Sequence, residues 1–157
     1  MENVSIDNLL LFTKAENLMH VVYPTLANYP RNERHSLVLE IKTAFISMLS
    51  NIQRAVSVKS KRLAFLQEAD ASLQSLKMMY RLSHRRKYIS AGFHLEVAEL
   101  LDEVNRLLVG FIKSTGNKNY KSKFQKAEDK EAPELKEAPE PKEGNKEPNK
   151  DSNKTDK

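Results

Sequence analysis

The stretch Glu33–Ser57, ERHSLVLEIKTAFISMLSNIQRAVS, decides the fold. Large and small apolar side chains recur along it at intervals of three and four residues. That spacing aligns them in one stripe along an α-helix, and such a stripe is stable only when it is buried against other apolar surface. The stretch therefore predicts a long amphipathic helix whose buried face is made by Leu37, Ile41, Ala44, Met48, Ile52 and Ala55.

The residues before this stretch show the same period. A first helix is expected to begin at Ser5 or Asp7, because either side chain can accept a hydrogen bond from an unpaired N–H group as an N-cap. Pro24 lacks a backbone donor and should bend this helix, and Pro30 should end it. Its stripe is Leu11, Ala15, Leu18, Val22 and Leu26.

Two further helices are expected after the stretch. The third spans residues 61–87, and the fourth runs from an N-cap at Ser90 to a stop at Gly116. The third stripe comprises Leu66, Ala69, Leu73, Leu76 and Met79, and the fourth comprises Val97, Leu101, Val104, Leu108 and Phe111.

The links between these four helices are short, and no stretch shows the sustained alternation of a strand. Short links force neighbouring helices to run antiparallel. The sequence therefore predicts an all-α fold, an antiparallel up-down-up-down four-helix bundle, with helices of roughly 37 Å at about 1.5 Å per residue.

The composition changes near Gly116. Residues 117–157 hold few large apolar side chains and repeat the tetrapeptide EAPE and the pair NK. Such a segment buries too little apolar area to offset the entropy lost on ordering. We therefore expect a bundle domain over residues 1–116 and a disordered, charged, proline-containing tail over residues 117–157.

The composition also limits the class of protein. Cysteine is absent, which excludes disulfides, thiolate metal sites and a cysteine nucleophile. The first residues lack the features of a signal peptide or membrane span, so we expect a soluble, cytoplasmic protein without a membrane partner. No phosphate-binding loop, nucleophile elbow or metal-binding histidine pair occurs. We expect neither an enzyme nor a cofactor or metal site, and Asp70, between two alanines, is expected to be semi-buried and structural.

Positive charge is concentrated in Tyr80–Ser90, YRLSHRRKYIS, which carries four cations and His84 without an acid. In an antiparallel bundle the link after the first helix lies at the same end as this stretch, and it adds two arginines. Guanidinium groups bind phosphates, and the interleaved rings of Tyr80, His84 and Tyr88 could stack on bases. The pattern predicts nucleic-acid binding by Arg31, Arg34, Arg81, Arg85, Arg86 and Lys87.

A structural alternative exists for part of this cluster. Cations in the last turn of a helix are favoured by the helix dipole, which accounts for residues 85–87. It does not account for Arg31 and Arg34, which lie where a helix begins. At the opposite end, Lys59, Lys61 and Arg62 form a second candidate patch.

Some apolar residues lie off the four stripes. They predict either a homo-oligomer, in which they contact another subunit, or simply a wider core within one chain. The sequence leaves both alternatives open for Phe12, Met19, Phe45, Leu49, Phe65, Leu100 and Leu107.

Three segments together resemble a known family. They are YPTLANYPRNERHSLVLEIKTAFISML (Tyr23–Leu49), LQEADASLQSLKMMYRLSHRRKYIS (Leu66–Ser90) and AELLDEVNRLLVGFIKS (Ala98–Ser114). Their order and spacing resemble Avd, the accessory variability determinant of diversity-generating retroelements, within the broader group of proteins encoded in 23S rRNA intervening sequences. Asn105, Val109 and Phe111 depart from the glycine, glycine and tryptophan usual in the family.

The resemblance implies more than the residue patterns do. It implies a barrel-like homopentamer that binds a reverse transcriptase and template-repeat RNA, is not itself catalytic, and supports mutagenic cDNA synthesis. The alternative is a stand-alone protein-interaction bundle of the intervening-sequence type, without a reverse transcriptase partner.

Overall fold

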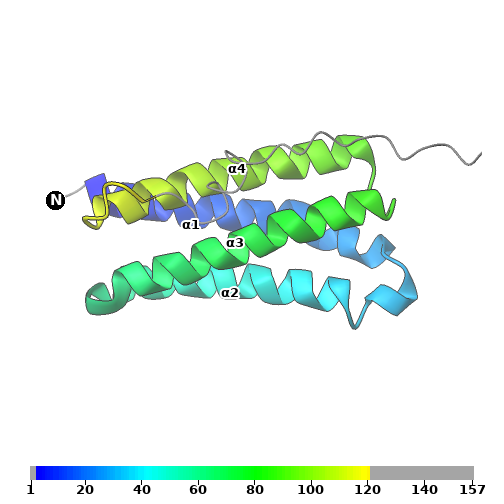
Figure 1. Ribbon diagram of the computed structural model, residues 1–157, viewed down its shortest axis with the longest axis horizontal. Coiled ribbons are helices and arrows are strands. Elements are labelled where there is room, and N and C mark those ends of the chain that lie inside the picture. Colours follow the sequence, from blue (N-terminus) through cyan, green and yellow to red (C-terminus); the bar gives the residue numbers. More distant parts are fainter. Residues whose placement is uncertain (1–2, 121–157) are drawn as a thin grey trace, which may run out of the picture.

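The computed structural model describes the backbone of residues 3–120 and the side chains of residues 9–120. Successive α-helices run in opposite directions (Figure 1), which confirms the predicted all-α, up-down-up-down four-helix bundle. The elements are α1 (Asn3–Val22), η1 (Tyr23–Asn28), η2 (Arg31–Glu33), α2 (Leu37–Ser57), η3 (Lys59–Lys61), α3 (Arg62–Arg85) and α4 (Ala91–Ser114), where η marks a 3₁₀ helix.

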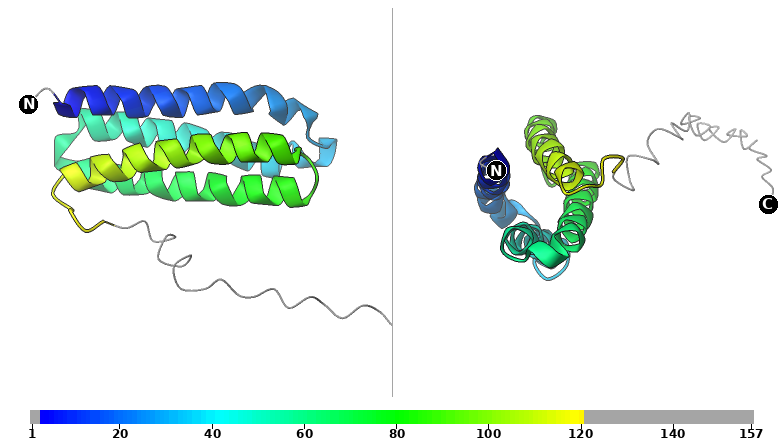
Figure 2. Two further views of the ribbon diagram at one scale, coloured as in Figure 1. Left: turned by 90° about the horizontal axis from the view of Figure 1, so that it is seen from above. Right: turned by 90° about the vertical axis from the view of Figure 1, so that its left-hand side faces the viewer.

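The four helices lie around a common centre (Figure 2), and their buried side chains form one apolar core. α2 packs most extensively against α3, whereas α4 lies against both α1 and α3. The predicted stripes form this core: their residues on α1, η1, α3 and α4 are buried, and on α2 only Leu37 and Ala44 are half-buried.

The apolar residues off the stripes pack within the same chain. Phe45 is fully enclosed in the core, and the others are half-buried against it. Their packing widens the core, which is one of the two alternatives that the sequence left open. A homo-oligomer remains a prediction.

The structure corrects the helix boundaries on either side of the first link. α1 begins at Asn3, before both predicted N-caps, and it ends at Val22 rather than bending through Pro24. Proline cannot donate the α-helical hydrogen bond and its ring crowds the preceding turn, so the chain tightens into η1. α2 begins at Leu37 rather than near Glu33, because Ser36 has non-helical backbone angles.

The expected start and stop of α4 are confirmed. The Ser90 hydroxyl accepts a hydrogen bond from the Phe93 N–H at 3.2 Å, as an N-cap does. Gly116 follows the helix with a φ of 104°, in a region that glycine adopts without steric cost.

A series of hydrogen bonds between polar side chains links α3 to α4 and also includes Tyr120, which follows Gly116. The Tyr120 hydroxyl donates to Asp70 Oδ2 at 2.7 Å, and Gln74 Nε2 donates to Asp70 Oδ1 at 3.1 Å and to Asn105 Oδ1 at 3.3 Å. Asp70, Gln74 and Asn105 are buried. Asp70 thus has the structural role that its position predicts, and Asn105 belongs to the same set of buried hydrogen bonds. The expected disorder of residues 121–157 lies outside the described part of the chain.

Candidate nucleic-acid interface

Two connections that are distant in sequence meet at one end of the bundle, on the right of Figure 1: residues 29–36 and residues 86–90. Glu33 joins them. The Tyr88 hydroxyl donates to Glu33 Oε1 at 2.9 Å, and the Ser36 hydroxyl donates to Glu33 Oε2 at 2.6 Å. The rings of Tyr88 and Tyr29 also pack together, with centroids 5.6 Å apart. We call this end, with the last turn of α3, the basic end.

The acid of the basic end is engaged in these internal contacts. The hydrogen bond from Ser36 and then that from Tyr88 lower the pKa of Glu33, and nearby Arg86 acts in the same direction. The bond to Glu33 in turn raises the pKa of Tyr88, since it stabilises the protonated hydroxyl. Glu33 therefore holds the two connections together through its hydrogen bonds.

The cations of the basic end point into solvent. Within the part of the chain that the structure describes, the ion pairs join Lys14 to Glu103 and Lys77 to Asp102, and these cations take no part in them. The structure thus brings both groups of predicted cations to one end and leaves them accessible. The exposed members at this end are Arg31, Arg34, Arg85, Arg86 and Lys87, and Arg81, one turn earlier on α3, is exposed as well.

Lys87 has an unusual backbone. The sequence placed it in the last turn of the third helix, but α3 ends at Arg85 and Lys87 has a φ of 59°. Its N–H bonds to His84 O and the Tyr88 N–H bonds to Ser83 O, both at 2.9 Å, which is the Schellman pattern. Glycine is the usual residue at this position, because a side chain there costs roughly 1–2 kcal/mol.

The structure corrects the prediction that three rings interleave with the cations. Tyr80 is only 1% exposed, because it lies four residues after Leu76 and continues the core stripe. Tyr88 is occupied by its contacts with Glu33 and Tyr29. His84 is half-buried, and its ring stacks on His94 with centroids 4.7 Å apart.

Arg81 and Arg85 share one face of α3, as their spacing predicts. Both line a surface groove with Met78 and Leu82, which are 63% and 43% exposed. This face therefore combines cations with apolar surface.

A sequence model of the family described as bAvd-like matches residues 9–115. The chain belongs to the bAvd-like family. Membership confirms the resemblance to Avd-type proteins, a family that is generally non-catalytic and accessory. A search of curated proteins gives no significant match.

The opposite end of this bAvd-like chain uses one of its predicted cations internally. Arg62 Nε donates to Ala55 O at 2.9 Å, and its guanidinium lies 5.7 Å from the centre of the Phe111 ring. Lys59 and Lys61 are exposed. We call this end, residues 55–62 with Phe111 and Lys113, the far end.

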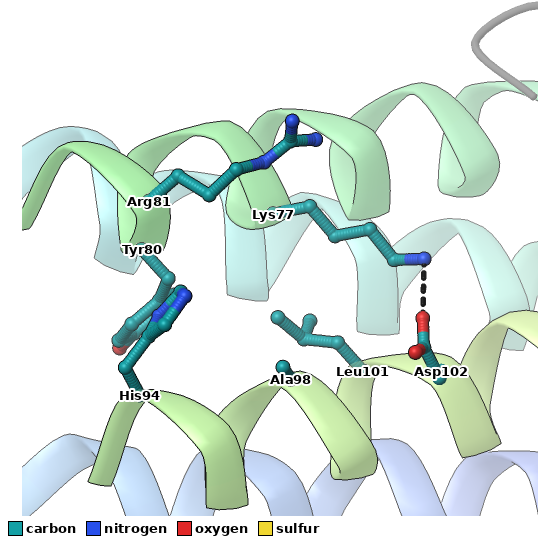
Figure 3. Close-up of a pocket in the computed structure, with 7 residues that line it drawn as sticks. All are labelled: Lys77, Tyr80, Arg81, His94, Ala98, Leu101 and Asp102. Atoms are coloured by element: carbon teal, nitrogen blue, oxygen red, sulfur yellow. Dashed lines mark hydrogen bonds and ion pairs between the residues drawn. The ribbon is translucent and has the colours of Figure 1, made fainter. Parts of the chain in front are cut away.

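Sequence reasoning missed a pocket beside the basic end of the bAvd-like bundle. It lies between α3 and α4, where His94 and Lys77 line it together with Arg81 (Figure 3). The sequence held one signal for this pocket. His84 and His94 flank the short link between two antiparallel helices, and such a link brings the two positions close together.

The described residues of this bAvd-like protein lack two kinds of feature. Among them, no cluster of histidines and carboxylates is arranged to hold a metal ion. None of their helices has the length and apolar character needed to cross a membrane.

Proposed function

We propose that this chain is a non-catalytic accessory protein of a diversity-generating retroelement. It acts as an oligomeric scaffold: the basic end binds template-repeat RNA, and another part of the surface holds the reverse transcriptase during mutagenic cDNA synthesis. Membership of the bAvd-like family supports the accessory role.

The observation that carries the RNA-binding part is the state of the charges at the basic end. Cations from two separate connections are exposed there, while the neighbouring acid, Glu33, is held by Ser36 and Tyr88. An array of exposed cations gains free energy on meeting phosphates, chiefly by releasing the counterions that RNA holds.

Lys87 adds a second argument. A backbone conformation that favours glycine carries a lysine here, in the middle of the cation cluster. The unfavourable conformation is compatible with a selected function for the charge, because backbone strain of this kind concentrates at functional sites.

Oligomerisation would add the positive charges of several chains and so strengthen the electrostatic attraction for RNA. Residues 1–117 hold 15 Lys and Arg against 11 Asp and Glu. The homopentamer expected from the family resemblance would multiply that excess to about +20, enough to attract a polyanion over several ångströms at physiological salt.

The test is a titration of the full chain with single-stranded RNA across a range of salt, with the particle mass measured by light scattering. We expect the logarithm of the binding constant to fall against the logarithm of salt with a slope of about −2 or steeper, because each contacted phosphate contributes about −0.7. Absence of binding at about 0.15 M salt, or a flat salt dependence, would contradict the RNA-binding role.

A second candidate is a stand-alone protein-interaction bundle of the intervening-sequence type. The groove that joins exposed Met78 and Leu82 to Arg81 and Arg85 favours it, since exposed apolar side chains beside charges suit a protein partner. A reverse transcriptase gene and a template repeat beside this gene would support the first candidate, and their absence would support the second.

A further inference from the structure

The pocket between α3 and α4 has a volume of about 330 Å³. This is near the lower limit for ligand sites, so it suits a small molecule or one unit of a polymer. Its lining residues come from both helices and are Lys77, Tyr80, Arg81, His94, Ala98, Leu101 and Asp102.

The pocket has two polar ends and an apolar middle (Figure 3). His94 stands at one end, Lys77 and Asp102 meet at the other, and Ala98 and Leu101 lie between them. A flat ligand with polar edges would match this arrangement, since its faces would lie on apolar side chains while its edges reached the polar ends.

His94 provides a flat ring held in a fixed orientation. It stacks on His84 with an angle of 1° between the rings, and His84 is not among the lining residues, so it supports His94 from outside the pocket. His94 Nδ1 is buried and has no hydrogen-bond partner in the described part of the chain. Burial, then His84 and Arg81, lower the pKa of His94, so its ring is neutral at pH 7.

The opposite end presents a donor beside an acceptor. Lys77 Nζ lies 2.7 Å from Asp102 Oδ1, and the Asp102 side chain is 67% exposed. A carboxylate accepts hydrogen bonds from exocyclic amino groups, which adenine, cytosine and guanine carry and uracil lacks.

Arg81 links this pocket to the proposed RNA-binding surface. It lines the pocket and also lines the outer groove that contains Arg85. A phosphate attached to a ligand in the pocket could therefore lie between Arg81 and the exposed cations.

We propose that the α3–α4 pocket takes one unpaired nucleotide of the bound RNA, with its base against the His94 ring and over Ala98 and Leu101, its phosphate at Arg81, and its amino group at Asp102. This inference rests on the proposed RNA-binding function. Sequence-specific contacts to RNA are typically made to such unstacked bases, on rings and base edges. A free phosphate would use Arg81 and Lys77 alone and leave the His94 ring and the apolar middle of the pocket uncovered.

The first test follows the ring signals of His94 in NMR spectra of the full chain during titration with adenosine 5′-monophosphate. We expect a saturable shift, and an Ala98→Phe variant that fills the pocket should weaken it by about tenfold or more, as loss of one stacked base does. Ala91→Phe, on the exposed start of the same helix, is the matched control and should bind like wild type. Inorganic phosphate that shifts the same signals equally would reduce the pocket to an anion site and overturn the proposal.

Asp102→Ala provides a test that does not depend on packing a large ring into the pocket. The wild-type protein should bind adenosine 5′-monophosphate about tenfold more tightly than uridine 5′-monophosphate, and the variant should lose most of this preference. Equal binding of the two nucleotides by wild type would overturn the assignment of Asp102 to the base edge.

Titration with single-stranded RNA separates failure of the pocket from failure of the proposed function. Ala98→Phe should weaken RNA binding by about three- to tenfold and lower the salt slope by no more than about 0.7, because it removes the base contact and at most the one phosphate contact at Arg81. Unchanged RNA affinity in this variant, together with no response to the mononucleotide, would overturn the pocket and leave the function standing. A wild-type chain that binds the mononucleotide but no RNA would overturn the function and keep a nucleotide site.

Discussion

The two ends of the bundle carry similar clusters of cations but use them differently. At the basic end, Glu33 holds the two connections together through Tyr88 and Ser36, and the cations around it are exposed. At the far end, a cation makes the internal contacts itself: Arg62 donates a hydrogen bond to Ala55 O, and its guanidinium lies over the Phe111 ring.

The difference shows why counting charges does not locate a binding site. A guanidinium that satisfies a helix carbonyl must break that contact before it can bind a phosphate, whereas an exposed one loses mainly water and counterions. The fold therefore separates cations that stabilise the bundle from cations available to a ligand. Most of the predicted cations that are available to a ligand lie at the basic end.

Replacing Arg62 with alanine should give the largest difference in stability between the two ends. The change removes a charged hydrogen bond to a carbonyl of a buried residue and a cation–π contact, so we expect a loss of about 2 kcal/mol in the free energy of unfolding. Arg86→Ala, at an exposed position, is the matched control and should cost about 0.5 kcal/mol or less. Urea denaturation measures both, and equal losses would remove the distinction between the ends.

Replacing Lys87 with glycine should move stability and RNA binding in opposite directions. Glycine relieves the positive φ, so we expect a gain of about 1 kcal/mol in the free energy of unfolding, while the lost charge should weaken RNA binding about fourfold. Lys113→Gly, at an exposed helical position of the far end, should instead destabilise the protein. A Lys87→Gly variant that binds RNA as wild type does would show that the charge has no part in the site.

The smallest expected effect is a pH dependence of stability caused by Glu33. Its pKa is lowered in the folded protein by the bonds from Ser36 and Tyr88, from an ordinary value of 4.5. The unfolded chain therefore binds the proton more readily, so this contribution is present above pH 4.5 and is lost as the pH falls through the lowered pKa.

Denaturation of wild type and Glu33→Gln between pH 3 and about 6 would measure this contribution. The difference between their free energies of unfolding should shrink as the pH falls. If the difference is constant over this range, the charge of Glu33 contributes nothing to the free energy of unfolding.

Much of the fold was predictable because the helical period is strong. The stripes of all four helices form the core, and Ser90 and Gly116 mark the ends of α4. Boundary errors occur at both ends of α1, at the start of α2 and at the end of α3, and those near Pro24 and Ser36 lie beside short 3₁₀ turns. Local side-chain and tertiary contacts decide such turns, and the apolar period does not record them.

The candidate site was predictable only in outline. Antiparallel topology placed Arg31 and Arg34 at the same end as Arg86 and Lys87, and the structure agrees. The roles of individual side chains were predictable only in part. Tyr80 lies four residues after Leu76, so its burial follows from the core stripe. The bond from Tyr88 to Glu33 required the structure, because it depends on where α3 ends. The pocket at His94 depends on two helices at once, so a search along a single stripe could not find it.

The most direct test of the account compares alanine triples at the two ends in the RNA titration. One variant replaces Arg85, Arg86 and Lys87, and the other replaces Lys59, Lys61 and Lys113, so each removes three exposed cations. We predict that at about 0.15 M salt the basic-end triple loses affinity on the order of 50-fold and flattens the salt slope by about 2, while the far-end triple changes affinity about threefold or less. Equal effects of the two triples, or wild-type binding by the basic-end triple, would contradict the claim that the basic end is the RNA site.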